Sequence, residues 1–173
     1  MDLIRSYKAH SPEERLYQQA MLDFAAQHSN CFERSKLIGH FTASALLLNK
    51  AGDKALLMHH KKLDQWFQLG GHADGDSDLL AVALKEAQEE SGIRDIKPVF
   101  SGVFDLDIHE LPETKEAPRH FHYDVRFLLQ VKSDEQVQMN QESKELRWIG
   151  KNTAELPTTS WSVVRLFKKW ATL

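Results

Sequence analysis

Three glutamates between residues 86 and 90 are the side chains best placed to do chemistry. Glu86, Glu89 and Glu90 follow the spacing i, i+3, i+4, which puts them on one face of a helix. Crowded carboxylates repel one another unless a cation lies among them. Hard divalent cations such as Mg²⁺ prefer oxygen ligands and bridge to substrate phosphates. The spacing therefore indicates a metal site, although a solvated acidic helix face would give the same pattern.

The residues around these glutamates form a longer pattern with fixed offsets. Its matching positions are Gly71, Glu86, Glu89, Glu90, Gly92 and Ile93, and Trp66 and Gly70 precede them in an aromatic lead-in. The segment resembles the Nudix box, which runs Gly, five residues, Glu, seven residues, Arg-Glu, an aliphatic, any residue, Glu-Glu, any residue, Gly, aliphatic. So many coincident offsets argue against a chance match.

Three positions depart from that pattern. Ser77 stands in place of an upstream glutamate, Lys85 in place of an arginine, and Ala87 in place of the aliphatic residue. Lys85 can still neutralise Glu89 one turn later, but it lacks the bidentate fork by which arginine orients a carboxylate. Ser77 is the more serious departure because it removes a carboxylate.

The loop before the helix offers replacements for that carboxylate. Asp74 and Asp76, together with His72, supply acids and an imidazole close to Ser77, and we expect Asp74 to contact the metal. The competing interpretation is that this loop only forms a turn and caps the helix, since Asp, Gly and Ser favour such places.

The resemblance to the Nudix family implies a fold, a cofactor and a reaction. The fold is α/β, a mixed β-sheet sandwiched between helices, with the box as a loop–helix–loop. The cofactor is Mg²⁺, with Mn²⁺ as an alternative. The reaction is hydrolysis of a phosphoanhydride (pyrophosphate) bond in a nucleoside diphosphate linked to another moiety, or in a related nucleotide, by metal-activated water. The implied metal site comprises Gly71, Glu86, Glu89, Glu90 and Asp74. One of the three helix glutamates can instead orient or deprotonate water, so all three are catalytic candidates.

A second polar group lies on residues 119–127, whose polar and apolar residues alternate. On a strand, His120, His122, Asp124 and Arg126 share one face. We predict that this face lines the pocket and that His120, His122, Arg126 and the loop residue His72 bind substrate. A solvent-facing side would also explain the polar set.

Glu142 and Glu145 come late in the chain, beside the apolar segment 146–149. Glu145 resembles the late-chain glutamate that supplies a base or an extra ligand in some Nudix enzymes. An ordinary loop carboxylate is the alternative.

Local patterns predict the elements that position these residues. Ser11 and Pro12 begin a helix that runs to about residue 30. Strands are expected at 41–48, 55–59, 66–69, 97–108, 119–132 and 145–149, and helices at 78–91 and from 160 to 170. Leu80, Leu84 and Ala87 are expected to anchor the glutamate helix in the core. We divide the chain into an N-terminal helical extension, 1–35, and a Nudix hydrolase domain, 36–173.

The amino-acid composition limits the classes of binding partner and the cellular compartment that we expect. The chain has 173 residues and a net charge of −3, which argues against broad binding to a nucleic-acid backbone. The N-terminus lacks a signal-like apolar run and no stretch is long enough to span a membrane, so we expect a cytoplasmic protein. Cys31, the single cysteine, fits a reducing compartment and a place in or near the core. The expected partner is a small nucleotide-like diphosphate. The oligomeric state is open, with a homodimer as one option.

Two other functions remain as alternatives. A non-catalytic nucleotide-binding Nudix module would explain the departures at Ser77 and Lys85, although it need not keep three like charges together. An isopentenyl-diphosphate isomerase-like enzyme needs a cysteine near a catalytic glutamate, and Cys31 has no such context. The leaving group of the substrate is not determined by the sequence.

Overall fold

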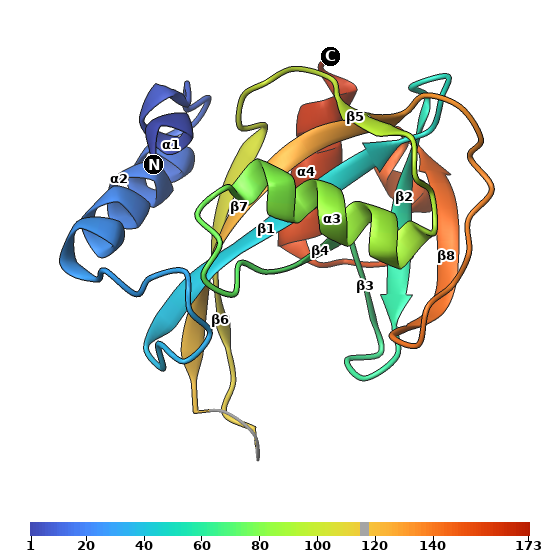
Figure 1. Ribbon diagram of the computed structural model, residues 1–173. Helices are drawn as coiled ribbons and strands as arrows, with labels where there is room; N and C mark the ends of the chain where they lie inside the picture. The colour runs from blue at the N-terminus through green and yellow to red at the C-terminus, as the bar shows by residue number, and fades with distance from the viewer. Residues whose placement is uncertain (115–117) are drawn as a thin grey trace.

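The computed structural model describes residues 1–114 and 118–173, and a strongly curled β-sheet forms its centre (Figure 1). The axis of the sheet is β1 (Gly39–Leu48), which pairs in parallel with β7 (His120–Val131) along its whole length. On its other edge β1 pairs antiparallel with β4 (Leu69–His72) and, at the Leu48–Ala55 pair, with β2 (Lys54–His60).

The remaining strands extend the sheet into two wings. In one wing β5 (Ile96–Pro98) and β6 (Asp105–Leu111) pair with β7. In the other wing β3 (Gln65–Phe67) and β8 (Ser143–Gly150) pair with β2. Because β2 joins β1 only near the end of that strand, the two wings diverge in Figure 1. The expected strand over 97–108 is thus two strands, β5 and β6.

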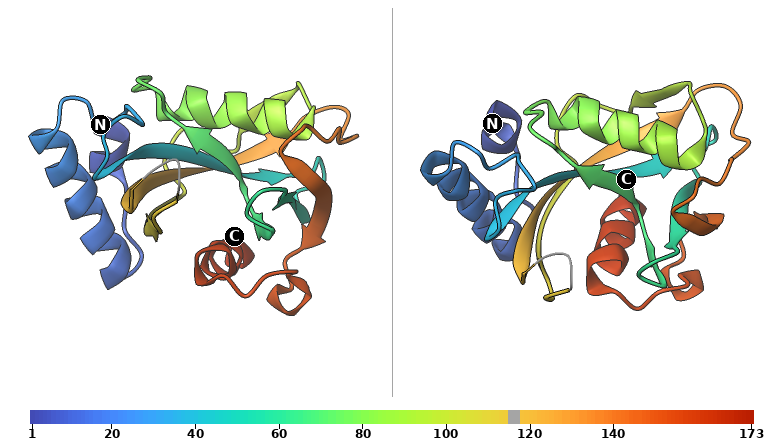
Figure 2. Two further views of the ribbon diagram at one scale, coloured as in Figure 1. Left: turned by 90° about the horizontal axis from the view of Figure 1, so that it is seen from below. Right: turned by 60° about the horizontal axis from the view of Figure 1, so that its bottom comes forward.

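Helices cover both faces of the sheet, as the Nudix resemblance implied. Figure 2 shows α3 (Leu79–Ser91) on one face and α4 (Trp161–Ala171) on the other, with the 3₁₀ turn η1 (Thr153–Glu155) leading into α4. Two short N-terminal helices, α1 (Asp2–Ser6) and α2 (Pro12–Gln27), lie beside the sheet, and α2 runs along β6. None of the helices in the described part of the chain combines the length and the apolar character that crossing a bilayer requires.

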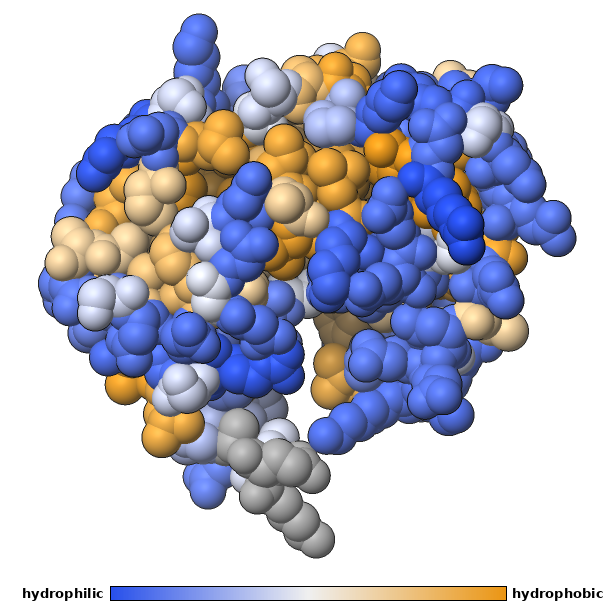
Figure 3. Space-filling view, in the orientation of Figure 1, coloured by the Kyte–Doolittle hydropathy of each residue, from blue (hydrophilic) through white to orange (hydrophobic). Residues whose placement is uncertain are grey.

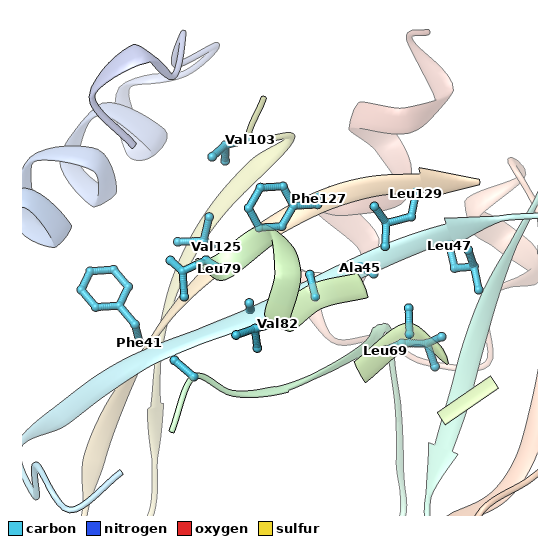
Figure 4. Packing of buried hydrophobic residues seen from close by; sticks show 14 of the residues in the cluster. Phe41, Ala45, Leu47, Leu69, Leu79, Val82, Val103, Val125, Phe127 and Leu129 are labelled. Atoms are coloured by element: carbon cyan, nitrogen blue, oxygen red, sulfur yellow. The ribbon is translucent and has the colours of Figure 1, made fainter. Parts of the chain in front are cut away.

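Every residue of β1 is buried, because alternate side chains serve two different cores. Phe41, Ala45 and Leu47 point toward α3 and pack with β7 and the start of that helix (Figure 4). Leu46 and Leu48 point to the opposite face and pack under α4. Removing apolar area from water at about 25 cal/mol per Å² makes this central strand the main anchor of the sheet.

The N-terminal helices share the core under α3. Ile4, Met21 and Phe24 belong to that apolar cluster, and the ring of Phe24 stacks on Tyr123 of β7 with centroids 4.2 Å apart. Ser11 caps α2 by accepting a hydrogen bond from the Glu14 N–H, as its sequence predicts. The division at residues 35 and 36 stays a prediction, although the extension packs closely onto the rest.

The rotation of α3 about its own axis differs from the expected one. Its ends are as predicted: Asp78 accepts a hydrogen bond from the Ala81 N–H, and Gly92 ends the helix with φ +74°. Ala87 is fully buried, as expected, and Leu80 and Leu84 pack against the core although they are only half-buried. Glu90, however, is 4% exposed. The expectation that the glutamates face away from the core was wrong for Glu90, because the helix sits over the side-chain-free glycines of β4.

Candidate functional site

Glu90 is the most deeply buried of the helix glutamates and is held against β4. Its Oε2 accepts a hydrogen bond of 2.8 Å from the Gly70 N–H. Burial raises the pKa of Glu90 to about 8, although the hydrogen bond from Gly70 acts to lower it. The nearby charges of Glu86 and Glu142 add to the rise. Such a carboxylate stays ionised at neutral pH only when a cation joins it.

Glu86 lies over Gly71, the next residue of β4. A Cβ atom on Gly71 would come within 2.6 Å of the Glu86 Cδ atom, so any other residue there would displace the carboxylate. Burial also raises the pKa of Glu86. The close approach of Glu86 therefore explains the glycine at position 71, whereas a Cβ atom on Gly70 would come within 2.7 Å of the Ala43 carbonyl oxygen of β1.

Lys85 is the one cation paired directly with these glutamates in the described residues. Its Nζ lies 3.2 Å from Glu86 Oε1 and 3.4 Å from Glu89 Oε2, which agrees with the expectation that it can neutralise Glu89. One exposed lysine does not balance three carboxylates, two of which have raised pKa values. The oxygen-rich, negatively charged donor set fits a Mg²⁺ ion.

The loop before α3 uses its acids for local structure. Arg34 donates two hydrogen bonds to Asp74, one to each carboxylate oxygen. Asp76 accepts a hydrogen bond of 2.8 Å from the Asp78 N–H, and Asp78 in turn caps the helix. These contacts favour the turn-and-cap interpretation. Metal contact by Asp74 stays a prediction, and it would require the pair with Arg34 to open.

The polar face of β7 divides into two parts. Arg126 is 1% exposed, and its guanidinium contacts Asp124 at 2.8 Å, Asp107 at 2.8 Å and Asp105 at 3.4 Å. Ser162 of α4 completes its partners. This placement argues against direct contact between Arg126 and a substrate and favours a structural role.

The ion pairs of Arg126 continue into a buried network that joins α4 and α2 to the sheet. Arg165 contacts Asp105 at 2.7 Å and Asp107 at 3.0 Å, and Lys169 contacts Asp105 at 3.2 Å and Glu14 at 2.8 Å. We call this set the buried ion network; its members are Glu14, Asp105, Asp107, Asp124, Arg126, Arg165 and Lys169.

The histidines expected to bind substrate do come together. His72, His120 and His122 gather near the start of β7, where His40 and His109 join them. Burial lowers the pKa of His72 to about 4 and that of His122 to about 2. Both rings are therefore uncharged at neutral pH, which weakens the idea that they attract phosphate as cations.

Of the late-chain acids, Glu142 relates more closely to the helix glutamates than Glu145 does. The carboxylate of Glu142 contributes to the raised pKa of both Glu86 and Glu90. Glu145 is half-exposed and pairs with Arg147 at 2.6 Å. A catalytic role for Glu145 stays a prediction, and Glu142 is the better placed of the two.

Sequence reasoning passed over Arg34, His40 and His109. No local pattern marks them, because the contacts that bring them to the site join distant segments. Arg34 binds Asp74, and His40 and His109 are both cross-strand neighbours of His122. Figure 3 shows the surface notched below α3, between the β6–β7 hairpin and the wing of β2 and β3. The glutamate helix borders this notch.

Comparison with known families agrees with the geometry at the helix and the glycine strand. The family model of the NUDIX domain matches residues 39–170, which is most of the chain. This chain belongs to the Nudix family. Within the matched range lie the curled sheet, α3, α4 and all three helix glutamates.

Individual relatives are distant. A "Probable DHNTP pyrophosphohydrolase" of Lactococcus lactis subsp. cremoris is 28% identical over 111 residues, which are 63% of this chain and 66% of that protein, slightly under two thirds. Among solved structures, the MutT protein of Methanosarcina mazei is similar with a TM-score of 0.63 at 20% identity, over 79% of this chain and 96% of the other. The dihydroneopterin triphosphate pyrophosphohydrolase of E. coli gives a TM-score of 0.57 at 15% identity, over 75% and 92%. At these identities the two structures speak for the fold alone.

Proposed function

We propose that this protein is a Mg²⁺-dependent hydrolase that cleaves a phosphoanhydride bond in a nucleotide-like diphosphate or triphosphate. The observation that carries the proposal is the convergence of Glu86 and Glu90 on Gly70 and Gly71 with too little positive charge to balance them. A purely structural site would not retain a buried carboxylate, Glu90, beside the half-buried Glu86, both with raised pKa values.

The proposed roles follow from the contacts of each glutamate. Glu90 and Glu86 would hold the ion, because their carboxylates are fixed against the backbone of β4. Glu89 is exposed toward solvent and is free to complete the ion's ligands or to take a proton from water. A divalent ion at this place would supply neutralisation of phosphate charge and activation of water. Mn²⁺ offers similar chemistry.

The substrate class rests on the relatives. The curated relative is named as a pyrophosphohydrolase of DHNTP, and one structural neighbour as a dihydroneopterin triphosphate pyrophosphohydrolase. Both names describe a small heterocycle that carries a phosphate chain. We extend this class, and no single compound within it, to the present chain.

A substrate screen tests the proposal directly. The full chain, stripped of metal with a chelator, is incubated with Mg²⁺ or Mn²⁺ and with nucleoside triphosphates, sugar nucleotides, ADP-ribose, dinucleotide polyphosphates and dihydroneopterin triphosphate. Products are separated by anion-exchange chromatography, and inorganic phosphate is measured with and without added inorganic pyrophosphatase, which distinguishes pyrophosphate from phosphate as the product. Cleavage of a sugar nucleotide, ADP-ribose or a dinucleotide polyphosphate gives two phosphorylated organic products, which the separation detects. We expect metal-dependent cleavage of at least one compound.

Glu89→Gln identifies the site that is responsible. It should lower the rate by about 100-fold or more, the usual loss when a charge partner of the transition state is removed. The matched control is Glu155→Gln, on η1 outside the box, which should leave the rate unchanged. Binding without turnover would instead favour a non-catalytic module, and conversion of a compound with its diphosphate left intact would favour an isomerase. The buried Cys31, whose pKa is raised by burial, gives the isomerase no reactive thiol.

A further inference from the structure

The five histidines near the start of β7 lie on one face of four adjacent strands, β4, β1, β7 and β6. His122 of β7 is the cross-strand partner of His109 on β6 and of His40 on β1. His72, at the end of β4, is paired with Thr42, two residues further along β1. Cross-strand neighbours have Cβ atoms about 4.5–5.5 Å apart, so this register forces the rings together.

Three of these rings are arranged as ligands for one ion. The ligand nitrogens of His40, His72 and His122 all lie within 4.8 Å of one another. Zinc–nitrogen bonds of about 2.0 Å in a tetrahedral site put nitrogens about 3.3 Å apart. The ligand nitrogens would thus have to approach one another by at most about 1.5 Å, which side-chain rotation can supply.

Two of the ring nitrogens are buried without a partner in the described residues. They are Nε2 of His40 and Nε2 of His122. His40 is 3% exposed, and its Nδ1 lies 3.4 Å from the carbonyl oxygen of Lys36. A proton on Nδ1 serves that carbonyl and leaves the Nε2 lone pair directed at the other rings. An unsatisfied buried polar atom destabilises the fold, and a bound ion would satisfy it.

The spacing of the rings favours a cation over an anion as the ligand. Attracting an anion would require protonated rings, and protonation would place like charges about 5 Å apart, the separation of the ring centroids. Neutral imidazoles do not attract phosphate strongly, but they are the form that binds metal.

We propose that His40, His72 and His122 form a second metal site, which takes a transition-metal ion of the Zn²⁺ type. Imidazole nitrogen suits Zn²⁺, Co²⁺ and Ni²⁺, whereas carboxylate oxygen suits Mg²⁺ and Mn²⁺. The two sites therefore select different ions, although Gly71 and His72 are neighbours in β4. The inference does not depend on the proposed hydrolase activity.

Flanking groups are placed to support such an ion. His120 stacks on His40, with centroids 5.2 Å apart, and its Nδ1 contacts the carbonyl oxygen of Pro118 at 2.7 Å. The Nδ1 of His109 lies 3.0 Å from an oxygen of Asp107. These contacts hold both rings in place beside the three proposed ligands.

Zinc binding in the presence of excess Mg²⁺ tests the proposal. The full chain is freed of metal with a chelator, Mg²⁺ is added to millimolar concentration to occupy the glutamates, and bound zinc is measured by equilibrium dialysis. We expect one Zn²⁺ per chain, and a rise in melting temperature on adding Zn²⁺. Co²⁺ in place of Zn²⁺ should give the visible absorption of a nitrogen-ligated tetrahedral ion.

Single substitutions locate the ion. His40→Gln, His72→Gln and His122→Gln should each weaken zinc binding by at least about 100-fold, since loss of a supporting residue alone costs about 10–100-fold. The exposed His10 is the matched control, and His10→Gln should bind zinc as the wild type does. Glu90→Gln should also retain zinc, because it belongs to the other site.

Three results would overturn the proposal. The first is that no zinc binds in excess Mg²⁺. The second is that the three histidine variants bind zinc as tightly as the wild type. The third is that Glu90→Gln no longer binds zinc. If His40→Gln fails to fold because it is so deeply buried, the half-buried His72 gives the same test. Its variant can be checked for folding by its melting temperature without metal.

Discussion

Two groups of carboxylates in this protein include buried members, and the groups differ in how their charge is balanced. In the buried ion network, four carboxylates face the three cations Arg126, Arg165 and Lys169 at close range. Under α3, Glu86, Glu89 and Glu90 share the single exposed Lys85.

The pKa values follow that difference. Burial alone would raise the pKa of Asp107, but the charge of Arg126 holds it well below its usual range. Burial of Glu90 meets no such cation, and its pKa rises to about 8. Equal burial therefore gives opposite shifts. A balanced cluster stabilises the fold, while an unbalanced one is completed by a ligand.

Removing the central cation of the buried ion network should have the largest effect. Arg126→Met leaves three buried aspartates around an apolar side chain, and breaking such a set should lower the free energy of unfolding by about 3–5 kcal/mol. Chemical denaturation at pH 7 measures the loss. As a control, Arg5→Met removes an exposed pair with Asp2 and should cost less than about 1 kcal/mol. A stable Arg126→Met protein with weakened substrate binding would restore the pocket role that the sequence suggested.

Glu90→Gln should give the opposite profile, a loss of activity with an intact fold. Glutamine keeps the volume and can still accept the Gly70 hydrogen bond, but it removes a charged ligand. We expect the rate to fall by about 100- to 1,000-fold, while the melting temperature without metal stays the same or rises. Glu14 is equally buried at 4% exposure, so Glu14→Gln is the matched control and should keep its activity within a few-fold. Loss of activity in both variants would contradict the assignment of different roles to the helix glutamates and the buried ion network.

Acid should reveal the contribution of Glu14 to stability. Burial alone would raise the pKa of Glu14, but the hydrogen bond from Lys169 brings it below the usual 4.5. Because the folded pKa is lowered, the stabilisation is present above pH 4.5 and disappears as the pH falls through the folded pKa. Glu14→Gln should thus be about 2 kcal/mol less stable than the wild type at pH 7, and the gap should close in acid. Denaturation curves of both proteins between pH 3 and pH 7 measure this difference in the free energy of unfolding. A difference that stays constant over this range would contradict the assignment.

The smallest effect is expected in the loop before α3. Asp74→Asn breaks the exposed ion pair with Arg34, which should cost less than about 1 kcal/mol. Because Arg34 occupies both carboxylate oxygens, we expect the Mg²⁺ concentration for half-maximal rate to stay within about twofold of the wild type. A marked increase in that concentration, with little change in melting temperature, would show that Asp74 replaces the carboxylate lost at Ser77.

The sequence by itself determined the glutamate helix and its place in a family. The spacing of Glu86, Glu89 and Glu90, the cap at Asp78 and the stop at Gly92 are local features that need no distant partner. For the same reason the alternation over 119–127 correctly predicted which side chains of β7 share a face.

Only the tertiary structure decided what covers each face. Alternation does not say that Arg126 meets aspartates of β6 or that His122 meets His40 of β1, because both depend on strand register. The rotation of α3 was likewise set by β4, where Gly71 leaves room for Glu86 and the Gly70 N–H donates a hydrogen bond to Glu90. Periodicity fixes which residues point the same way, and packing between distant segments fixes what they meet.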